Sequence, residues 1–225
     1  MSLKQKLLYK ISRNVVRLYA YFLLNMDIHW HAPLPEGPVL IASNHPSTSD
    51  PFYIMVLSRR PVSIMMIESP FRIPVFGSLL HHAGHIPVIP ANKHAALDSA
   101  HQQLRTGHTV AIFPEGNHSP REGGYLPPRT GAARLALLSG AAVVPVGIYL
   151  DRKRSVHITT HIAGRRTVGY WHLKGKYSMT VGQSMHFEGN AEDNAHVYSI
   201  SKVIMDKIRA LARESQVRAE ATDGK

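Results

Sequence analysis

A histidine and an aspartate five residues apart form the first pair of side chains in this chain that could do chemistry. His45 and Asp50 stand in the polar run 44–50, directly after the apolar segment 38–43. A carboxylate held against one imidazole nitrogen fixes the tautomer and raises the basicity of the ring, which leaves the other nitrogen available as a general base. The alternative is an ordinary helix start, in which Asp50 caps the helix and His45 is a loop residue. The spacing permits base catalysis without requiring it.

Two further clusters follow apolar segments. In the run Phe-Pro-Glu-Gly, Pro114 stops the segment 109–113 and Gly116 permits a tight turn, so Glu115 is expected at the end of a strand. The alternative is that this run is an ordinary turn at the end of a strand, in which Glu115 has no functional role. The third cluster consists of small and apolar residues, typical of a helix docked on a sheet, at 73–77 and 84–87.

Strand and helix patterns alternate through the middle of the chain. Strands are expected at 38–43, 62–67, 86–89, 109–113 and 142–150, and helices at 50–58, 75–82, 93–105 and 130–138. Helical crossovers of this length join parallel strands and cover both faces of the sheet. Strand-like pieces at 156–181 are expected at the far edge of the sheet, before a closing helix at 191–213. We therefore predict an α/β domain over 31–214, with a mostly parallel central sheet flanked by helices on both faces, and a flexible tail at 215–225.

The first 30 residues are expected to form an amphipathic helix. Its basic residues fall at i, i+4, i+7 and i+11, and its apolar face consists of Leu7, Ile11, Val15, Leu18 and Phe22, beside the basic stripe of Lys6, Lys10, Arg13 and Arg17. The scattered cations exclude a signal peptide and interrupt the run of about 20 apolar residues that a membrane span needs. Such a helix could dock on its own domain or lie in a membrane interface. We favour the interface, which predicts a peripheral protein on the cytoplasmic face of a membrane.

Composition narrows the chemistry. The absence of cysteine excludes disulfides, thiolate metal sites and a cysteine nucleophile. Lys and Arg number 26 against 15 Asp and Glu, a net charge of +11, which predicts an anionic partner: nucleic acid, an acidic membrane face or a phosphorylated substrate. Histidines such as His157 and His161 could be metal ligands, but they lie in unrelated segments and lack the pattern of a zinc protease helix. We expect no metal and no cofactor.

In their order and spacing, the clusters resemble the motifs of the acylglycerol-phosphate acyltransferases of the glycerolipid acyltransferase family. The likeness covers roughly residues 38–150. It comprises the HX4D motif (Asn44, His45, Asp50), the pair Ile73–Gly77 and Gly84–Ile86, the run Phe113–Gly116, the helix Gly131–Ala136 and the strand Val144–Val146. The resemblance implies transfer of a fatty acyl group from acyl-CoA or acyl carrier protein to the hydroxyl of a lysophospholipid, most simply 1-acylglycerol-3-phosphate.

The resemblance also implies roles for single residues. His45 is the expected general base, with Asp50 as its orienter and no covalent acyl-enzyme. Asn44 is expected to fix the backbone of His45 and, with Glu115 and Gly116, to belong to the substrate-binding site. Glu115, beside Gly116, either orients the acceptor hydroxyls or braces its own loop.

The chain departs from the family pattern at basic positions that are thought to hold the phosphate of the acceptor. His118 replaces the arginine of the usual Thr-Arg-Ser, and Pro90 replaces another arginine. We expect the phosphate to be held instead by a replacement set: Lys93, Arg121, Arg129, Arg72 and a protonated His118. The alternative is an acceptor without a phosphate, such as a glycolipid or another lipid alcohol.

A function of another class is also possible: a nonenzymatic basic protein that binds anionic lipid or nucleic acid. That hypothesis leaves the ordered clusters around His45 and Glu115 unexplained, and the sequence carries no recognisable nucleic-acid-reading motif. We therefore expect an acyl thioester, a lysophospholipid and an anionic membrane surface as partners, and no nucleic acid.

Overall fold

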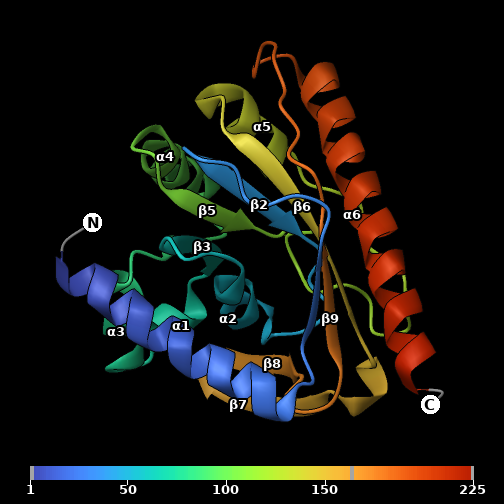
Figure 1. Cartoon of the computed structure of the whole chain (residues 1–225). Coiled ribbons are helices and arrows are strands. Elements are labelled where there is room, and N and C mark those ends of the chain that lie inside the picture. The colour runs from blue at the N-terminus through green and yellow to red at the C-terminus, as the bar shows by residue number, and fades with distance from the viewer. Residues whose placement is uncertain (1–2, 163–164, 224–225) are drawn as a thin grey trace.

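A seven-stranded sheet forms the centre of the computed structural model, which describes residues 3–162 and 165–223. The strand order is β1-β9-β6-β2-β5-β3-β4, and every neighbouring pair is parallel except β6 and β9. The strands are β1 (Asp27–Trp30), β2 (Val39–Ser43), β3 (Val62–Ile67), β4 (Ile86–Val88), β5 (Thr109–Ile112), β6 (Ala142–Leu150) and β9 (Tyr177–Val181). The predicted mostly parallel α/β sheet is confirmed (Figure 1).

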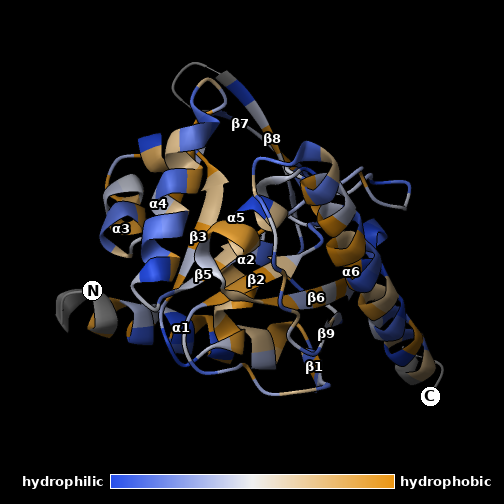
Figure 2. Cartoon of the chain, turned by 90° about the horizontal axis from the view of Figure 1, so that it is seen from above, coloured by the Kyte–Doolittle hydropathy of each residue, from blue (hydrophilic) through white to orange (hydrophobic). Residues whose placement is uncertain are grey.

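Each face of the sheet has its own core, because alternate residues of a strand point to opposite faces. Val39 and Ile41 of β2 belong to the core that contains residues of α1 (Leu3–Leu23), α2 (Asp50–Ile54) and the short helix η1 (Met55–Leu57). Leu40 and Ala42 belong to the core of α4 (Lys93–Arg105), α5 (Gly131–Ser139) and α6 (Asn194–Asp223). Figure 2 shows the hydrophobic strands in the centre and hydrophilic surface on outer helices such as α4. The smaller elements are η2 (Ser69–Arg72), α3 (Phe76–His82) and η3 (Arg152–Arg154).

The segment 156–181 differs from the prediction that it forms the far edge of the sheet. β7 (Val156–Ile162) and β8 (Arg165–Trp171) pair only with each other, as a separate antiparallel ribbon. β9 lies inside the sheet, between β1 and β6. The strand at this edge of the sheet is β1, which the sequence analysis had included in the N-terminal helix, and β4 lies at the other edge. Strand β1 has only four residues, Asp-Ile-His-Trp, and is half-buried to exposed, so its polar–apolar alternation is too short to mark a strand.

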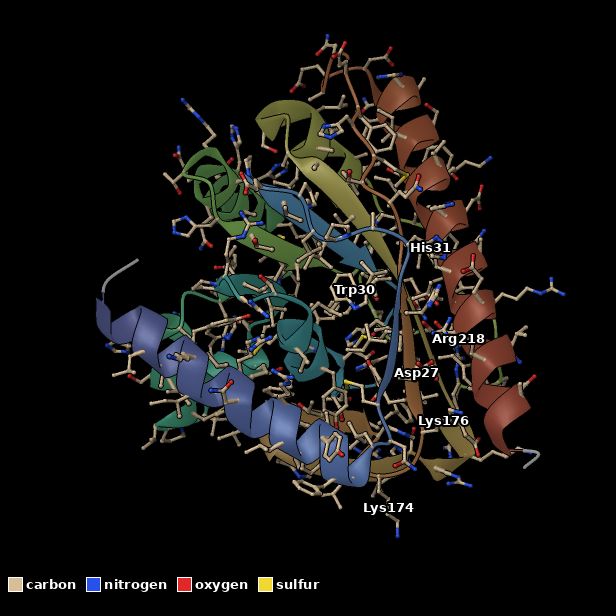
Figure 3. All side chains as sticks on the ribbon, viewed as in Figure 1. Asp27, Trp30, His31, Lys174, Lys176 and Arg218 are labelled. Atoms are coloured by element: carbon tan, nitrogen blue, oxygen red, sulfur yellow. The ribbon has the colours of Figure 1, made fainter. Side chains whose placement is uncertain are left out.

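The predicted flexible tail at 215–225 is also wrong, because α6 continues to Asp223. The Ser215 hydroxyl is buried, donates to the Gly147 carbonyl at 2.9 Å and contacts the Thr180 hydroxyl at 2.7 Å. Arg218 donates to the Asp27 carboxylate at 2.9 Å, which ties α6 to β1 (Figure 3). In the sequence, the polar residues of this segment suggest a solvated tail. In the structure, Ser215 and Arg218 form hydrogen bonds with residues of β1, β6 and β9. Residues 224–225, like 1–2 at the other end, lie outside the described part.

Helix α1 docks through a face other than the predicted apolar one. Tyr9, Ala20 and Leu24 are buried, and the Tyr9 hydroxyl donates to the Met55 carbonyl at 3.0 Å. The members of the predicted apolar face are each more than half exposed: Leu7, Ile11, Val15, Leu18 and Phe22. The helix therefore packs on its own domain and leaves a second apolar face uncovered. Within 3–162 and 165–223, no helix has the length and hydropathy needed to cross a membrane.

Candidate active site

His45 and Asp50 meet where β2 ends and α2 begins. His45 Nδ1 lies 2.9 Å from Asp50 Oδ2, and the His45 side chain is 15% exposed whereas that of Asp50 is fully buried. A carboxylate accepts hydrogen bonds, so this contact favours the tautomer with the proton on Nδ1. Among the described residues, no protein group bonds Nε2, which leaves that nitrogen as a free acceptor. The predicted pairing of these two side chains is present.

Two more donors hold the Asp50 carboxylate. The Ser47 backbone N–H donates to Oδ2 at 2.8 Å, and the Tyr177 hydroxyl of β9 donates to Oδ1 at 2.8 Å. Burial, the charge of Asp50 and the hydrogen bond to it raise the pKa of Tyr177 well above its usual value, so the phenol keeps its proton and remains a donor. Three hydrogen bonds thus stabilise a carboxylate that water does not reach.

Glu115 holds loops together, the second of the two roles expected for it. The carboxylate is buried; its Oε1 accepts the His45 backbone N–H at 3.1 Å and the Ser119 hydroxyl at 2.5 Å. Oε2 accepts the Leu126 backbone N–H at 2.8 Å. Because both oxygens already accept from the protein, the geometry speaks against direct contact with an acceptor hydroxyl. Glu115 thereby joins the loop of His45 to the loop that follows β5.

Asn44 and Gly116 also have structural partners. The Asn44 amide accepts from the Ile148 N–H at 2.7 Å and donates to the Ile148 carbonyl at 2.8 Å, which extends the pairing of β2 with β6. Asn44 is therefore buried in the sheet and not in a position to bind substrate, and it is Glu115 that holds the His45 backbone. Gly116 has φ +65°, and a Cβ there would lie 2.3 Å from Arg129 Nε, so glycine is needed for the turn and for the arginine above it.

His118 lies against His45 but is not positively charged. The two ring centroids are 4.3 Å apart, and His118 Nε2 lies 3.2 Å from the Thr48 hydroxyl. Burial, followed by the proximity of His45, lowers the pKa of His118 to about 3. The expectation that a protonated His118 supplies charge for a phosphate is therefore contradicted near neutral pH.

The remaining basic candidates divide into two groups. Arg129 lies over Gly116, and Arg121 Cζ lies 5.8 Å from the centre of the Tyr170 ring, which in turn contacts His118. Arg72 is paired with Glu68 at 2.7 Å. Lys93 begins α4 after β4, three strands away from β2 in the sheet, and within the described residues no bond or ring contact links it to the others. The structure brings Arg121 and Arg129 to the site, but not Lys93 or Arg72.

The ribbon strand β8 is a part of the site that the sequence analysis missed. The Thr48 N–H donates to the Tyr170 carbonyl, and the Tyr170 N–H donates to the Thr48 hydroxyl, both at 2.8 Å. The Ser47 hydroxyl also donates to the Tyr170 carbonyl, at 2.9 Å, and accepts the His172 N–H. The loop between His45 and Asp50 is therefore fastened to β8. Nothing local in the sequence indicated this partnership, since the pairing spans more than 120 residues.

The comparisons with known proteins agree with this geometry. A family model described as "Acyltransferase" matches residues 25–149, more than half of the chain. The chain belongs to the acyltransferase family. The matched part of this family member contains His45, Asp50 and Glu115, whereas Tyr170 and Tyr177 lie beyond it.

The curated relatives of this family member are described as 1-acyl-sn-glycerol-3-phosphate acyltransferases. A 1-acyl-sn-glycerol-3-phosphate acyltransferase of Pseudomonas aeruginosa is 28% identical over 164 residues, which is 69% of this chain and 57% of the relative. The chloroplastic protein LPAT1 of Arabidopsis thaliana, with the same description, is 27% identical over 58% of this chain and 37% of its own. The chain thus spans about half the length of the curated relatives it matches.

A solved structure shares the fold. The crystal structure of the 1-acyl-sn-glycerophosphate (LPA) acyltransferase PlsC from Thermotoga maritima superposes with a TM-score of 0.64 at 19% identity, covering 94% of this chain and 80% of that one. At that identity the match supports the architecture of the family member and not its substrate.

Proposed function

We propose that this protein transfers a fatty acyl group from an acyl thioester to the hydroxyl of a lysophospholipid, with His45 as general base. The observation that carries the proposal is the contact of His45 Nδ1 with buried Asp50, which leaves Nε2 free beside the motifs of an acyltransferase. The curated relatives, all named 1-acyl-sn-glycerol-3-phosphate acyltransferases, support 1-acylglycerol-3-phosphate as the acceptor.

The chemistry needs few groups. The acceptor hydroxyl attacks the thioester carbonyl while its proton passes to His45 Nε2; the carbon–sulfur bond then breaks, and the thiolate of the donor takes up a proton as it leaves. The resulting imidazolium is stabilised by Asp50. No covalent acyl-enzyme is needed, and the chain has no cysteine that could form one.

Two arginines are the proposed contacts of the acceptor phosphate. Arg121 and Arg129 lie on the loop after β5, which Glu115 fastens through Ser119 and Leu126. Arginine binds phosphate through charge-assisted, often bidentate hydrogen bonds. Because His118 is neutral, it does not supply charge for the phosphate. We therefore expect the phosphate to bind the exposed side chains of Arg121 and Arg129.

An acceptor comparison tests this proposal. Purified protein is incubated with an acyl thioester and either lysophosphatidic acid or an uncharged monoacylglycerol, and the product lipid is identified by mass spectrometry. We expect phosphatidic acid to form faster than diacylglycerol. Preference for the uncharged alcohol would refute the phosphate contact, and acylation of neither lipid would refute the acyl-transfer proposal.

We also propose that α1 holds the protein on an anionic membrane surface. The exposed apolar face of α1 is flanked by exposed Lys10 and Arg17, a pattern typical of interfacial helices. Arg13 is not part of this contact, because it donates to the Val56 carbonyl at 3.2 Å. Deletion of α1 would remove Tyr9 and Ala20 from the core, so point substitutions are the better test.

Vesicle binding measures this contact. Binding to vesicles containing phosphatidylglycerol should weaken with added salt and fall by more than about tenfold in Lys10→Gln/Arg17→Gln, since each of the two cations contributes about 1 kcal/mol near the surface. The matched control is Arg105→Gln/Lys207→Gln, on helices of the opposite face of the sheet. Equal binding of both double variants would contradict the role of α1.

A further inference from the structure

Two aromatic rings enclose the imidazole of His45. The Phe113 ring lies 4.1 Å from it, centroid to centroid, at an interplanar angle of 20°, and the His118 ring lies 4.3 Å from it at 37°. Among the ring contacts of the described residues, Phe113 and His118 do not touch each other, which places them on opposite faces of His45. Asp50 fixes the edge that carries Nδ1. Both faces and one edge of the ring are thereby held.

His118 is itself held from the far side. Its Nε2 lies 3.2 Å from the Thr48 hydroxyl, and that hydroxyl accepts the backbone N–H of Tyr170. The Tyr170 ring also meets the His118 ring edge-on at 6.0 Å. The position of His118 is therefore set by the loop between His45 and Asp50 and by strand β8, and not only by its own loop.

The charge at this position bears on the reaction. When His45 accepts the proton of the attacking hydroxyl it becomes positive, and a second cation about 4 Å away would disfavour that state. Burial beside His45 keeps the pKa of His118 far below neutral pH, so the neighbouring ring stays neutral. An arginine would carry its charge at every working pH.

We propose that His118 is a positioning residue for His45: its uncharged ring closes one face of the imidazole and leaves that imidazole free to take up a proton. This inference rests on the proposed role of His45 as general base. His118 then acts on the proton acceptor His45 and does not contact an anionic substrate.

Other charged and titratable groups near His45 also influence how readily its imidazole takes up a proton. The charged and titratable side chains that face it are Asp50 from α2, and Glu115 and His118 from the loop after β5. Tyr177 from β9 acts on Asp50, and Tyr170 from β8 acts on His118. The flanking cations are Arg121, over Tyr170, and Arg129, over Gly116. Of the titratable side chains in direct contact with the His45 ring, Asp50 is a carboxylate and His118 is a neutral imidazole, so His118→Arg places a positive charge where the ring of His118 now lies.

A direct titration of His45 tests the proposal without relying on turnover. The pKa of the His45 imidazole is measured by NMR on protein labelled at histidine, with His45→Ala assigning the signal. In His118→Arg we expect the pKa of His45 to fall by about one unit relative to His118→Phe, which keeps an uncharged ring in place. The matched control is His186→Arg, which adds the same charge at an exposed residue after β9.

Kinetics supply the second readout. The pH profile of kcat/KM for the thioester is measured at saturating acceptor. In His118→Arg its acid limb should move to lower pH by the same amount as the pKa of His45 measured by NMR. His118→Ala, which removes the ring, should lower kcat about tenfold and more than His118→Phe does. Equal pKa values of His45 in His118→Arg and His118→Phe, both folded, would overturn the proposal. If the wild type transfers no acyl group, the proposed function fails, while the titration still decides whether His118 controls His45.

Discussion

At the scale of single residues, the site depends on a carboxylate that is removed from water and still needs to remain charged. Asp50 achieves this with three donors: His45 and the Ser47 backbone from its own loop, and Tyr177 from β9. Loss of one donor to a buried carboxylate leaves part of its desolvation uncompensated, which costs about 1–3 kcal/mol. Tyr177 is therefore expected to matter for catalysis although it lies behind Asp50, away from His45.

The variant Tyr177→Phe isolates this hydroxyl. We expect turnover to fall about tenfold and the free energy of unfolding to fall by about 1–3 kcal/mol, because Asp50 Oδ1 loses its donor. Tyr53→Phe is the matched control: that buried hydroxyl, in contact with the Tyr177 ring, donates to the His172 carbonyl and not to Asp50. Similar losses of stability with unequal losses of turnover support the account; equal turnover in both variants would count against it.

The sequence predicted the residues that are close along the chain and missed those that are brought in by distant pairing. His45 and Asp50 share one short loop, and Glu115 follows a strand adjacent to β2, so the ends of parallel strands had to bring them together. Tyr177 and Tyr170 come from β9, which inserts antiparallel to β6, and from the separate ribbon. Hydrophobic periodicity indicates strands but not their partners. The role of Asn44 was misjudged for the same reason, since its partner Ile148 is 104 residues away.

At the scale of elements, α6 depends on a close approach to β6. A Cβ added to Gly147 would lie 2.0 Å from the Ala212 backbone nitrogen of α6, a distance that only a shift of the helix could relieve. The polar contacts of Ser215 and Arg218 continue this interface beyond the point where the sequence suggested a tail. Helix propensity and apolar spacing defined the start of α6 to within a few residues, whereas its end depends on buried polar pairs that periodicity does not reveal.

Gly147→Ala should therefore be strongly destabilising. We expect the free energy of unfolding, measured in urea, to fall by about 3 kcal/mol or more, since overpacking of a rigid backbone contact is costly. Gly131→Ala serves as the control, because a Cβ there would meet only side-chain atoms at 3.4 Å and beyond. A Gly147→Ala protein as stable as Gly131→Ala would show that α6 does not pack as described.

At the scale of the whole molecule, buried neutral histidines couple stability to pH. Burial lowers the pKa of His85 to about 4 and that of His118 to about 3, and it lowers the pKa of His172 as well. In the unfolded chain these imidazoles titrate near about pH 6.5. Below that pH the unfolded state binds more protons than the folded state. The contribution of these histidines to the free energy of unfolding is therefore fully present above about pH 6.5 and is lost as the pH falls toward their pKa values in the folded state.

We expect the free energy of unfolding to decrease between pH 7.5 and pH 5, with each such histidine contributing up to about 1.4 kcal/mol per pH unit. Urea unfolding at several pH values measures the slope. His85→Asn should reduce it, because an amide oxygen can still accept the Ile64 N–H but does not titrate. His186→Asn, at an exposed position, should leave the slope unchanged. A stability that is constant from pH 7.5 to pH 5 would contradict the burial of these side chains as neutral groups.

The most direct test of the account is the rate of acyl transfer from a thioester to lysophosphatidic acid in wild type, His45→Ala and the exposed control His186→Ala. Removal of a positioned general base costs about 10²–10⁴-fold in rate. We predict a loss of that size in His45→Ala alone, with circular dichroism and the urea midpoint showing that the protein remains folded. A folded His45→Ala protein that transfers acyl groups within about threefold of the wild-type rate would contradict the central claim that His45 accepts the proton of the attacking hydroxyl.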